Sequence, residues 1–255
     1  SSGVWRGEKE TDNHIRLPEV RHMIVLNILE YYFIASVTYF STSSILWLMY
    51  RLNRQQYLLP TSFMLYMLLL TISQFYADKI GQIGPVFFNL GIITYSATVA
   101  ILDYIVLKFG KSYGMTLVRV AVISQILISI LNYLVIEFPP AQFWSYQQAF
   151  SEVMGVSARV VVGSVFAFFT SQTYDTYLVS RIKGGVIKRV GMSDPVSMTI
   201  DSLVFVPVAF YGVLPNNVVL TLMLYQIVGK LLLTPLTITA VWLNRKALNY
   251  GTRSP

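Results

Sequence analysis

The sequence predicts an all-α polytopic membrane protein, and three observations support this prediction. Of its 255 residues, 55% are hydrophobic and only 12% are charged, proportions that differ strongly from those of soluble domains. The charged residues gather between apolar runs of roughly 20 residues, the length that a helix needs to cross a bilayer. Lysine and arginine are concentrated in alternate short loops. These features exclude a soluble enzyme and a single-span receptor.

Seven apolar segments follow a polar extramembrane tail of residues 1–22. We expect membrane-spanning helices at residues 23–50, 60–80, 86–107, 114–136, 150–180, 194–213 and 218–243, followed by a short cytoplasmic tail at residues 244–255. Helix-breaking residues separate them at Pro60, Gly84-Pro85, Gly110, Pro139-Pro140, Gly184-Gly185 and Pro215. Ser193-Asp194-Pro195 predicts the start of the sixth helix, because a capping side chain precedes a proline.

The loop charges predict the orientation of these helices, because cytoplasmic loops retain an excess of lysine and arginine. Eleven such residues fall on one side of the membrane: Arg51, Arg54, Lys108, Lys111, Arg181, Lys183, Lys188, Arg189, Arg245, Lys246 and Arg253. Only Lys79 falls in a loop on the other side. We therefore expect the N-terminus outside the cell and the C-terminus in the cytoplasm. Orientation explains the net charge of +7, so no nucleic-acid partner is expected.

Several kinds of chemistry are excluded by composition. The chain has no cysteine, and its two histidines, His14 and His22, lie in the N-terminal tail. Disulfides, thiolate metal sites and an intramembrane histidine relay are therefore excluded. No phosphate-binding G-x(4)-G-K-[ST] loop occurs, so energy would come from an ion gradient, metabolic trapping of the substrate or a separate ATPase. We expect no catalytic residues, no metal site and no cofactor.

Polar stripes within the predicted helices indicate candidate functional residues, because charged groups are costly inside hydrocarbon. Three stripes have helical spacing: Ser193, Ser197 and Asp201; Ser164, Ser171 and Asp175, with Gln172 adjacent; and Gln226, Lys230 and Thr234. They must face the bundle interior or a wet cavity, since lipid offers no polar partner. Lys230 lies near the middle of its span, so we expect it to pair with Asp201 or Asp175. Interhelical bonding without any ligand is the alternative interpretation.

The second half of the chain carries motifs of a known family. Pro139-Pro140-Ala141 is similar to that family's short extracellular loop. Further matches follow its R-x(4)-S-x(7)-Q-x(2)-D and R-N-x-x-S-x(7)-D-x(3)-F patterns at Arg159, Ser164, Gln172 and Asp175, and at Arg189, Ser193, Asp201 and Phe205. On these residues, and on Lys230 and Thr234-Pro235, the chain resembles the vitamin uptake transporter family, also called the queuosine precursor transporter or YhhQ-like family. The resemblance covers about residues 74–243.

The early helices depart from the family pattern. The A-N-x(4)-K segment corresponds to Gln74 through Lys79, which keeps only the lysine. In D-x(3)-E-x(2)-G, Asp103 and Gly110 are kept, but Leu107 occupies the acidic position. The family has six spans. The helix at residues 23–50 therefore resembles an N-terminal addition to a six-helix transporter domain at residues 60–243.

The resemblance implies import of a purine-like molecule across the cell membrane, namely a 7-deazaguanine such as preQ0 or preQ1. A carboxylate can accept the N–H edge of such a ring while aromatic side chains stack on its faces. The predicted substrate-binding residues are Asp201, Asp175, Lys230, Gln172, Arg189, Ser197, Gln226, Asp103 and Arg159. The expected partners are the substrate and the lipid bilayer, with a homo-oligomer or larger membrane complex left open. The alternative function is a structural or assembly subunit that has reused this fold.

The charge asymmetry makes a testable prediction about orientation. A single cysteine introduced by Gly185→Cys should react with a membrane-impermeant maleimide only after the cells are opened. A cysteine placed before Met23 should react in intact cells. Because the chain has no native cysteine, the background labelling is zero. Labelling of Gly185→Cys from outside would contradict the predicted orientation.

Overall fold

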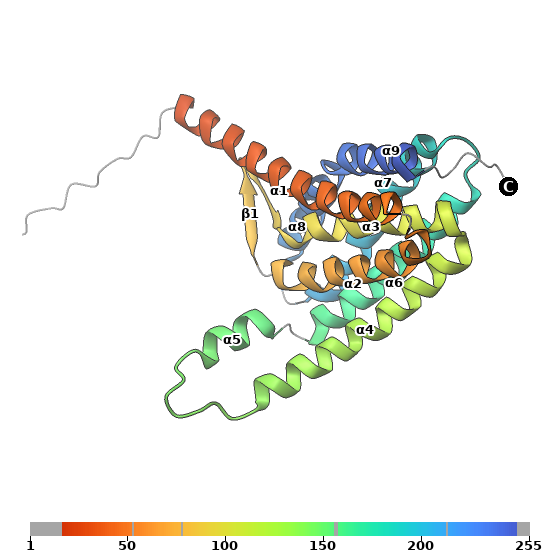
Figure 1. Ribbon diagram of the computed structural model, residues 1–255. Helices are drawn as coiled ribbons and strands as arrows, with labels where there is room; N and C mark the ends of the chain where they lie inside the picture. Colours follow the sequence, from red (N-terminus) through yellow and green to blue (C-terminus); the bar gives the residue numbers. More distant parts are fainter. Residues whose placement is uncertain (1–16, 53, 78, 156–157, 213, 249–255) are drawn as a thin grey trace, which may run out of the picture.

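The computed structural model describes residues 17–248 except 53, 78, 156–157 and 213. The structure is a helical bundle with one short β-hairpin (Figure 1). In chain order the elements are α1 (Leu17–Arg51), the 3-10 turn η1 (Gln55–Tyr57), α2 (Leu58–Ala77), β1 (Ile80–Ile83), β2 (Val86–Asn89), α3 (Gly91–Phe109), α4 (Lys111–Glu137), α5 (Gln147–Met154), α6 (Ala158–Arg181), α7 (Val186–Phe210), α8 (Asn216–Leu231) and α9 (Thr234–Leu248).

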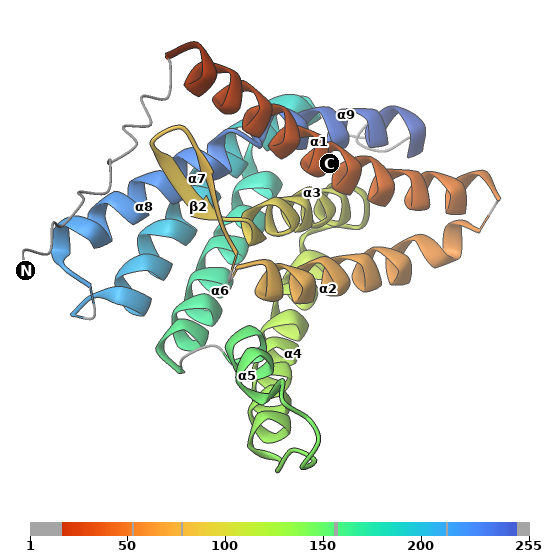
Figure 2. The same ribbon diagram turned by 90° about the vertical axis from the view of Figure 1, so that its left-hand side faces the viewer.

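Five stretches of the described residues are long and apolar enough to cross a membrane: Arg21–Arg51, Gln55–Ala77, Gly91–Phe109, Lys111–Glu137 and Asn216–Asn244. Helix α3 is the most enclosed of these, with 78% of its apolar window buried against 17% for α1. It lies at the centre of the bundle and contacts α1, α2, α4, α6, α8 and α9 (Figure 2). The α3 residues are therefore shielded from the bilayer on every side.

Helices α6 and α7 are not among the five apolar stretches, because serine, threonine, glutamine and aspartate interrupt their apolar sequence. The two helices pack against each other along their length, and α3, α4, α8 and α9 flank them. Gly163 permits this close approach, since a Cβ atom there would lie 3.3 Å from the backbone nitrogen of Ala209. The predicted spans at residues 150–180 and 194–213 thus correspond mainly to this polar pair of helices, each of which has one buried and one exposed face.

A β-hairpin joins the second and third predicted spans, and it includes the first residues of the third span. Ile80 pairs with Asn89 and Ile83 pairs with Val86 in antiparallel register. Gly84 adopts a φ of +58° in the turn, a conformation that glycine reaches without steric cost. Residues 80 and 86–89, predicted to be helical, are therefore extended. The predicted break at Gly84-Pro85 is confirmed as the turn of the hairpin.

Three helix boundaries also differ from the prediction. The segment at residues 150–180 is divided into α5 and α6, and α5 folds back against α4. Helix α7 begins at Val186, so Asp194 and Pro195 lie inside it and the predicted helix start there is wrong. The last span is divided into α8 and α9 just before Thr234-Pro235, because proline lacks the N–H that would continue the backbone ladder.

Helix α1 is fastened to the broken helix pair α8 and α9 by its side chains. The Tyr31 hydroxyl donates to the Gly229 carbonyl at 2.9 Å, and the Tyr32 hydroxyl donates to the Leu232 carbonyl at 2.8 Å. Tyr39 and Thr237 share a hydrogen bond of 2.7 Å. These bonds hold α1 against the segment that carries Lys230, and they supply donors to carbonyls near the α8–α9 break.

Several cations of the predicted cytoplasmic loops gather at one end of the bundle. The Lys108 ammonium lies 5.6 Å from the Tyr50 ring, at the ends of α3 and α1. Lys111 and Arg181 both lie over the Tyr177 ring, at 4.8 and 5.1 Å. The β-hairpin lies at the opposite end (Figure 1). This distribution agrees with the alternating charge pattern of the sequence, because one end of the bundle carries the loop cations.

Candidate functional site

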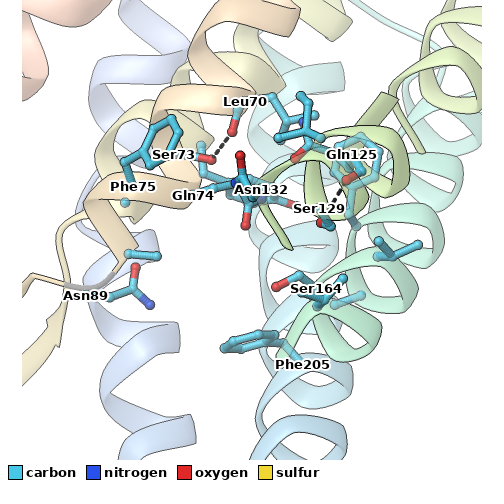
Figure 3. Close-up of a pocket in the computed structure, with 18 of the residues that line it drawn as sticks. Leu70, Ser73, Gln74, Phe75, Asn89, Gln125, Ser129, Asn132, Ser164 and Phe205 are labelled. Atoms are coloured by element: carbon cyan, nitrogen blue, oxygen red, sulfur yellow. Dashed lines mark hydrogen bonds between the residues drawn. The ribbon is translucent and has the colours of Figure 1, made fainter. Parts of the chain in front are cut away.

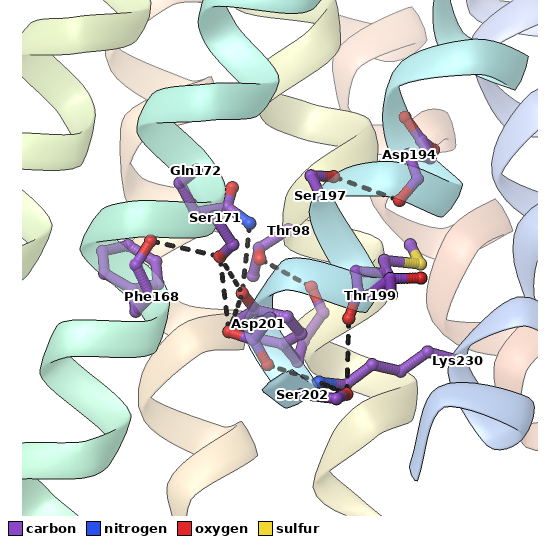
Figure 4. Close-up of polar contacts among 12 residues, drawn as sticks. Thr98, Phe168, Ser171, Gln172, Asp194, Ser197, Thr199, Asp201, Ser202 and Lys230 are labelled. Carbon is purple, nitrogen blue, oxygen red and sulfur yellow. Dashed lines mark hydrogen bonds and ion pairs between the residues drawn. The ribbon is translucent and has the colours of Figure 1, made fainter. Parts of the chain in front are cut away.

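A buried ion pair lies where α3, α6, α7 and α8 meet. The Lys230 ammonium on α8 pairs with the Asp201 carboxylate on α7, as the sequence predicted (Figure 4). The residues are only 3% and 8% exposed. Lys230 also donates to the Ser202 hydroxyl at 3.0 Å. Two charges so deep in a bundle are tolerated because each compensates the other.

Hydroxyl groups from two other helices complete the surroundings of Asp201. The Tyr95 hydroxyl on α3 donates to Asp201 Oδ1 at 2.8 Å, and the Ser171 hydroxyl on α6 donates to the same oxygen at 3.3 Å. The Tyr95 ring lies 5.3 Å from the Lys230 ammonium, so the aromatic face adds a favourable contact with the cation. We call Asp201, Lys230, Tyr95, Ser171 and Ser202 the Asp201 cluster.

A further pair of side chains extends this network to α2. The Gln172 amide donates to the Tyr95 hydroxyl at 3.2 Å, and the Tyr66 hydroxyl donates to the Gln172 carbonyl oxygen at 3.4 Å. Gln172 and Tyr66 are both fully buried. The chain of bonds fixes the rotamer of Tyr95, and Tyr95 in turn orients Asp201. The network therefore holds the carboxylate in one position.

The Asp201 cluster forms part of the wall of a cavity of about 160 Å³. This volume is similar to the roughly 150 Å³ of a protein cavity that accepts benzene, so a small planar molecule matches its size. Asp201, Lys230, Tyr95 and Gln226 are polar members of the wall, and Phe75, Phe168 and Phe205 supply aromatic surface. Figure 3 shows the cavity lining around Gln74, Gln125 and Phe205. The combination of apolar surface with a few polar groups is typical of ligand sites.

Another part of the wall is formed by a polar stripe on α4 that the sequence analysis did not identify. Gln125, Ser129 and Asn132 line the cavity (Figure 3). The Gln125 side-chain nitrogen has no hydrogen-bond partner in the described part of the chain, although the residue is only 7% exposed. Their spacing of i, i+4 and i+7 is a helical stripe and could have revealed them. The unsatisfied amide is a donor available to a ligand in the cavity.

The structure divides the predicted site residues among separate places. Asp201, Lys230 and Gln226 line the cavity, and Gln172 lies behind it in the Tyr95 network. Arg189 donates from Nε to the Val179 carbonyl at 2.8 Å and joins α7 to α6 instead. Arg159 lies in the first turn of α6, but its side chain is outside the described part of the structure.

Asp103, Asp175 and Ser197 do not line this cavity. Asp103 on α3 and Asp175 on α6 meet Asp194 on α7, and one oxygen from each lies within 4.8 Å of the others. All three side chains are fully buried. The Ser197 hydroxyl bonds to the Asp194 carbonyl oxygen at 3.1 Å, next to this group. We call Asp103, Asp175 and Asp194 the carboxylate cluster.

Comparison with known proteins identifies the kind of protein to which these clusters belong. A family model described as "Putative vitamin uptake transporter" matches residues 89–243, more than half of the chain. The chain belongs to this transporter family. A Bacillus subtilis (strain 168) protein named "Probable queuosine precursor transporter" is 26% identical over 172 residues, which cover 65% of this chain and 75% of the relative. No solved structure matches the chain significantly.

The family assignment agrees with the resemblance seen in the sequence. This vitamin uptake transporter is a multi-pass membrane protein and not an enzyme. The matched residues include every member of the Asp201 cluster and of the carboxylate cluster, whereas α1 and α2 precede the match. The alternative of a structural or assembly subunit gains no support from these comparisons.

The buried ion pair makes a prediction about stability. Lys230→Met should lower stability by about 3 kcal/mol, because it leaves Asp201 buried without a counter-charge. Asp201→Asn in the Lys230→Met background should recover a large part of that loss, since it removes the uncompensated charge. Thermal unfolding of the purified variants in detergent measures both effects. If the stability loss of the double variant equalled the sum of the losses of Lys230→Met and Asp201→Asn alone, the two residues would not be energetically paired.

Proposed function

We propose that this vitamin uptake transporter imports a planar purine-like molecule across the cell membrane, and that its substrate is a 7-deazaguanine such as preQ0 or preQ1. The position of Asp201 carries the proposal, because it places a carboxylate beside a lysine on the wall of a cavity with the size for one planar ligand. The name of the Bacillus subtilis relative refers to the same class of substrate.

Complementary chemistry supports this choice of ligand. A 7-deazaguanine presents an N–H and an exocyclic amine on one edge, and Asp201 supplies the acceptor oxygens for them. Its neighbouring carbonyl oxygen is an acceptor that Lys230 or Gln226 can satisfy. Phe168 and Phe205 line the same cavity and offer aromatic surface to the faces of the ring. Donors, acceptors and stacking surface therefore lie around one volume.

Asp201 already accepts three hydrogen bonds, which use about three of the four lone-pair positions of a carboxylate. A two-point contact with the ligand therefore requires one donor to leave. Ser171 is the donor that leaves most easily, because its bond is long at 3.3 Å and its hydroxyl also lies 3.3 Å from the Phe168 carbonyl oxygen. Tyr95 and Lys230 then remain and hold the carboxylate in place.

We propose that the chain consists of a transport unit and one accessory helix. The six-helix domain of residues 60–243 is the transport unit, and α1 stabilises the α8–α9 segment that carries Lys230. The N-terminus lies outside the cell and the C-terminus in the cytoplasm, as the loop charges favour. Broken helices near the middle of the membrane, such as α8 and α9, are common at substrate sites of secondary transporters.

Replacing the recognition carboxylate tests the proposal. Asp201→Asn keeps the shape of the side chain but directs an amide donor toward the donors of the ligand. We expect a loss of about 1 to 3 kcal/mol of binding, or roughly tenfold or more in affinity for preQ1. Titration calorimetry of the purified protein measures the affinity. Glu137→Gln is the matched control, because it removes an exposed carboxylate at the end of α4.

Melting curves of the same variants separate recognition from a scaffolding role. If Asp201 only held helices together, Asp201→Asn would lower the melting temperature while folded molecules kept the affinity of the parent protein. Unchanged affinity in Asp201→Asn would therefore contradict the proposal. A folded variant with weakened binding supports it.

Gln125 offers a second test with the opposite effect on stability. Gln125→Leu removes a buried donor that has no partner, so the unliganded protein should keep or gain stability. Affinity for preQ1 should nevertheless fall by about 1 kcal/mol, or roughly fivefold. Gln148→Leu is the control, because it makes the same change at an exposed position away from the cavity. Affinity equal to that of the control would show that Gln125 does not contact the ligand.

A further inference from the structure

The carboxylate cluster differs from the Asp201 cluster in forming no ion pair with any residue that the structure describes. Within the described residues, both oxygens of Asp103, both oxygens of Asp175 and Oδ2 of Asp194 have no hydrogen-bond partner. The remaining oxygen, Asp194 Oδ1, accepts a bond of 3.3 Å from the Ser193 hydroxyl. All three residues have zero exposed surface. Five unpartnered carboxylate oxygens in a bundle interior require compensation, because an unpaired buried charge is very costly.

The surrounding ionisable side chains direct their own donors elsewhere. Tyr39 on α1 shares its hydroxyl hydrogen bond with Thr237, and Tyr66 on α2 donates to Gln172. Arg189, near the start of α7, donates from Nε to the Val179 carbonyl. None of these groups forms a hydrogen bond to the five orphaned oxygens. The negative charge of the cluster is therefore balanced either by a bound cation or by protons on the carboxylates themselves.

We propose that Asp103, Asp175 and Asp194 bind one hard metal cation of the size of Na⁺ or Ca²⁺. The ligand atoms are all oxygens, which such cations prefer. Ca²⁺ accepts protein oxygens in flexible geometry, whereas Mg²⁺ keeps several of its waters and is seldom bound by a cage of protein ligands alone. One oxygen of each carboxylate lies within 4.8 Å of the others, so a single ion can contact all three residues. Na⁺ is close to Ca²⁺ in size, so the same oxygens can bind it.

The cation site and the proposed substrate site share three helices, α3, α6 and α7. On α6, Asp175 follows Ser171 by four residues, about one helical turn. On α7, Asp194 precedes Asp201 by seven residues, about two turns. A cation bound by three helices fixes the spacing of α3, α6 and α7, and thereby the position of Tyr95, Ser171 and Asp201. This coupling rests on the proposed function, whereas the cation site itself does not.

A cation titration without substrate tests the site directly. The melting temperature of the purified full-length protein is measured in choline chloride, with NaCl, CaCl₂ or MgCl₂ added at constant ionic strength and pH. We expect Na⁺ or Ca²⁺ to raise it in a saturable manner, and the two arms show which ion binds. Choline and Mg²⁺ should have little effect. Because no 7-deazaguanine is present, a failure here is distinct from a failure of substrate binding.

Variants assign the effect to the three carboxylates. Asp194→Asn and Asp175→Asn should each raise the apparent dissociation constant of the cation at least tenfold, while Glu137→Gln should leave it unchanged. Both cluster variants should melt at a higher temperature than the parent protein in choline chloride alone, because they remove an uncompensated charge. If a variant fails to fold, the titration of the parent protein still shows whether a metal ion binds. A melting temperature that responds to pH but to none of the metal ions would show that protons occupy the cluster and would overturn the proposal.

Discussion

The cost of placing charge inside a membrane-embedded bundle is the constraint on which the rest of this structure depends. Asp201 meets that constraint with an ammonium and two hydroxyl groups, supplied by three other helices. The carboxylate cluster has no such compensation from the described side chains. The protein thus contains one carboxylate that is satisfied by other side chains and a cluster of three that is not, at which we propose a bound cation. This difference is why we propose a recognition site at Asp201 and a cation site at the carboxylate cluster.

The arrangement of the helices follows from the same constraint. Helices α6 and α7 turn their polar residues toward α3, α4, α8 and α9, while apolar side chains such as Phe166 and Leu203 lie on their exposed faces. Helix α3 contributes Tyr95 and Asp103 to the two clusters and is accordingly the most enclosed of the apolar helices. Helix α1 presents exposed apolar side chains outward and uses Tyr31, Tyr32 and Tyr39 to hold the α8–α9 segment. The outer helices therefore exclude lipid from the polar centre.

Helical spacing was sufficient to predict that Lys230 pairs with a carboxylate, because a charged lysine in the middle of a span is costly without a partner. It could not separate Asp175 from Asp201. Both lie at similar depth, and the direction of each side chain within the bundle depends on helix packing. Asp194 was interpreted as a helix cap because Ser-Asp-Pro has the same local pattern at a helix start and inside a helix that contains proline. The role of Tyr95 could not be predicted, because its partners lie on other helices and tyrosines are common in apolar helices.

Transport by the purified protein in liposomes tests the central claim most directly, which is that the cavity beside Asp201 recognises the N–H edge of a 7-deazaguanine. The account predicts saturable uptake of labelled preQ1 that unlabelled preQ0 suppresses. An analogue methylated at the N–H that faces Asp201 should compete at least tenfold less well, because it loses a hydrogen bond and places a methyl group against a carboxylate. Equal competition by the methylated analogue, or uptake no greater than in protein-free liposomes, would contradict it.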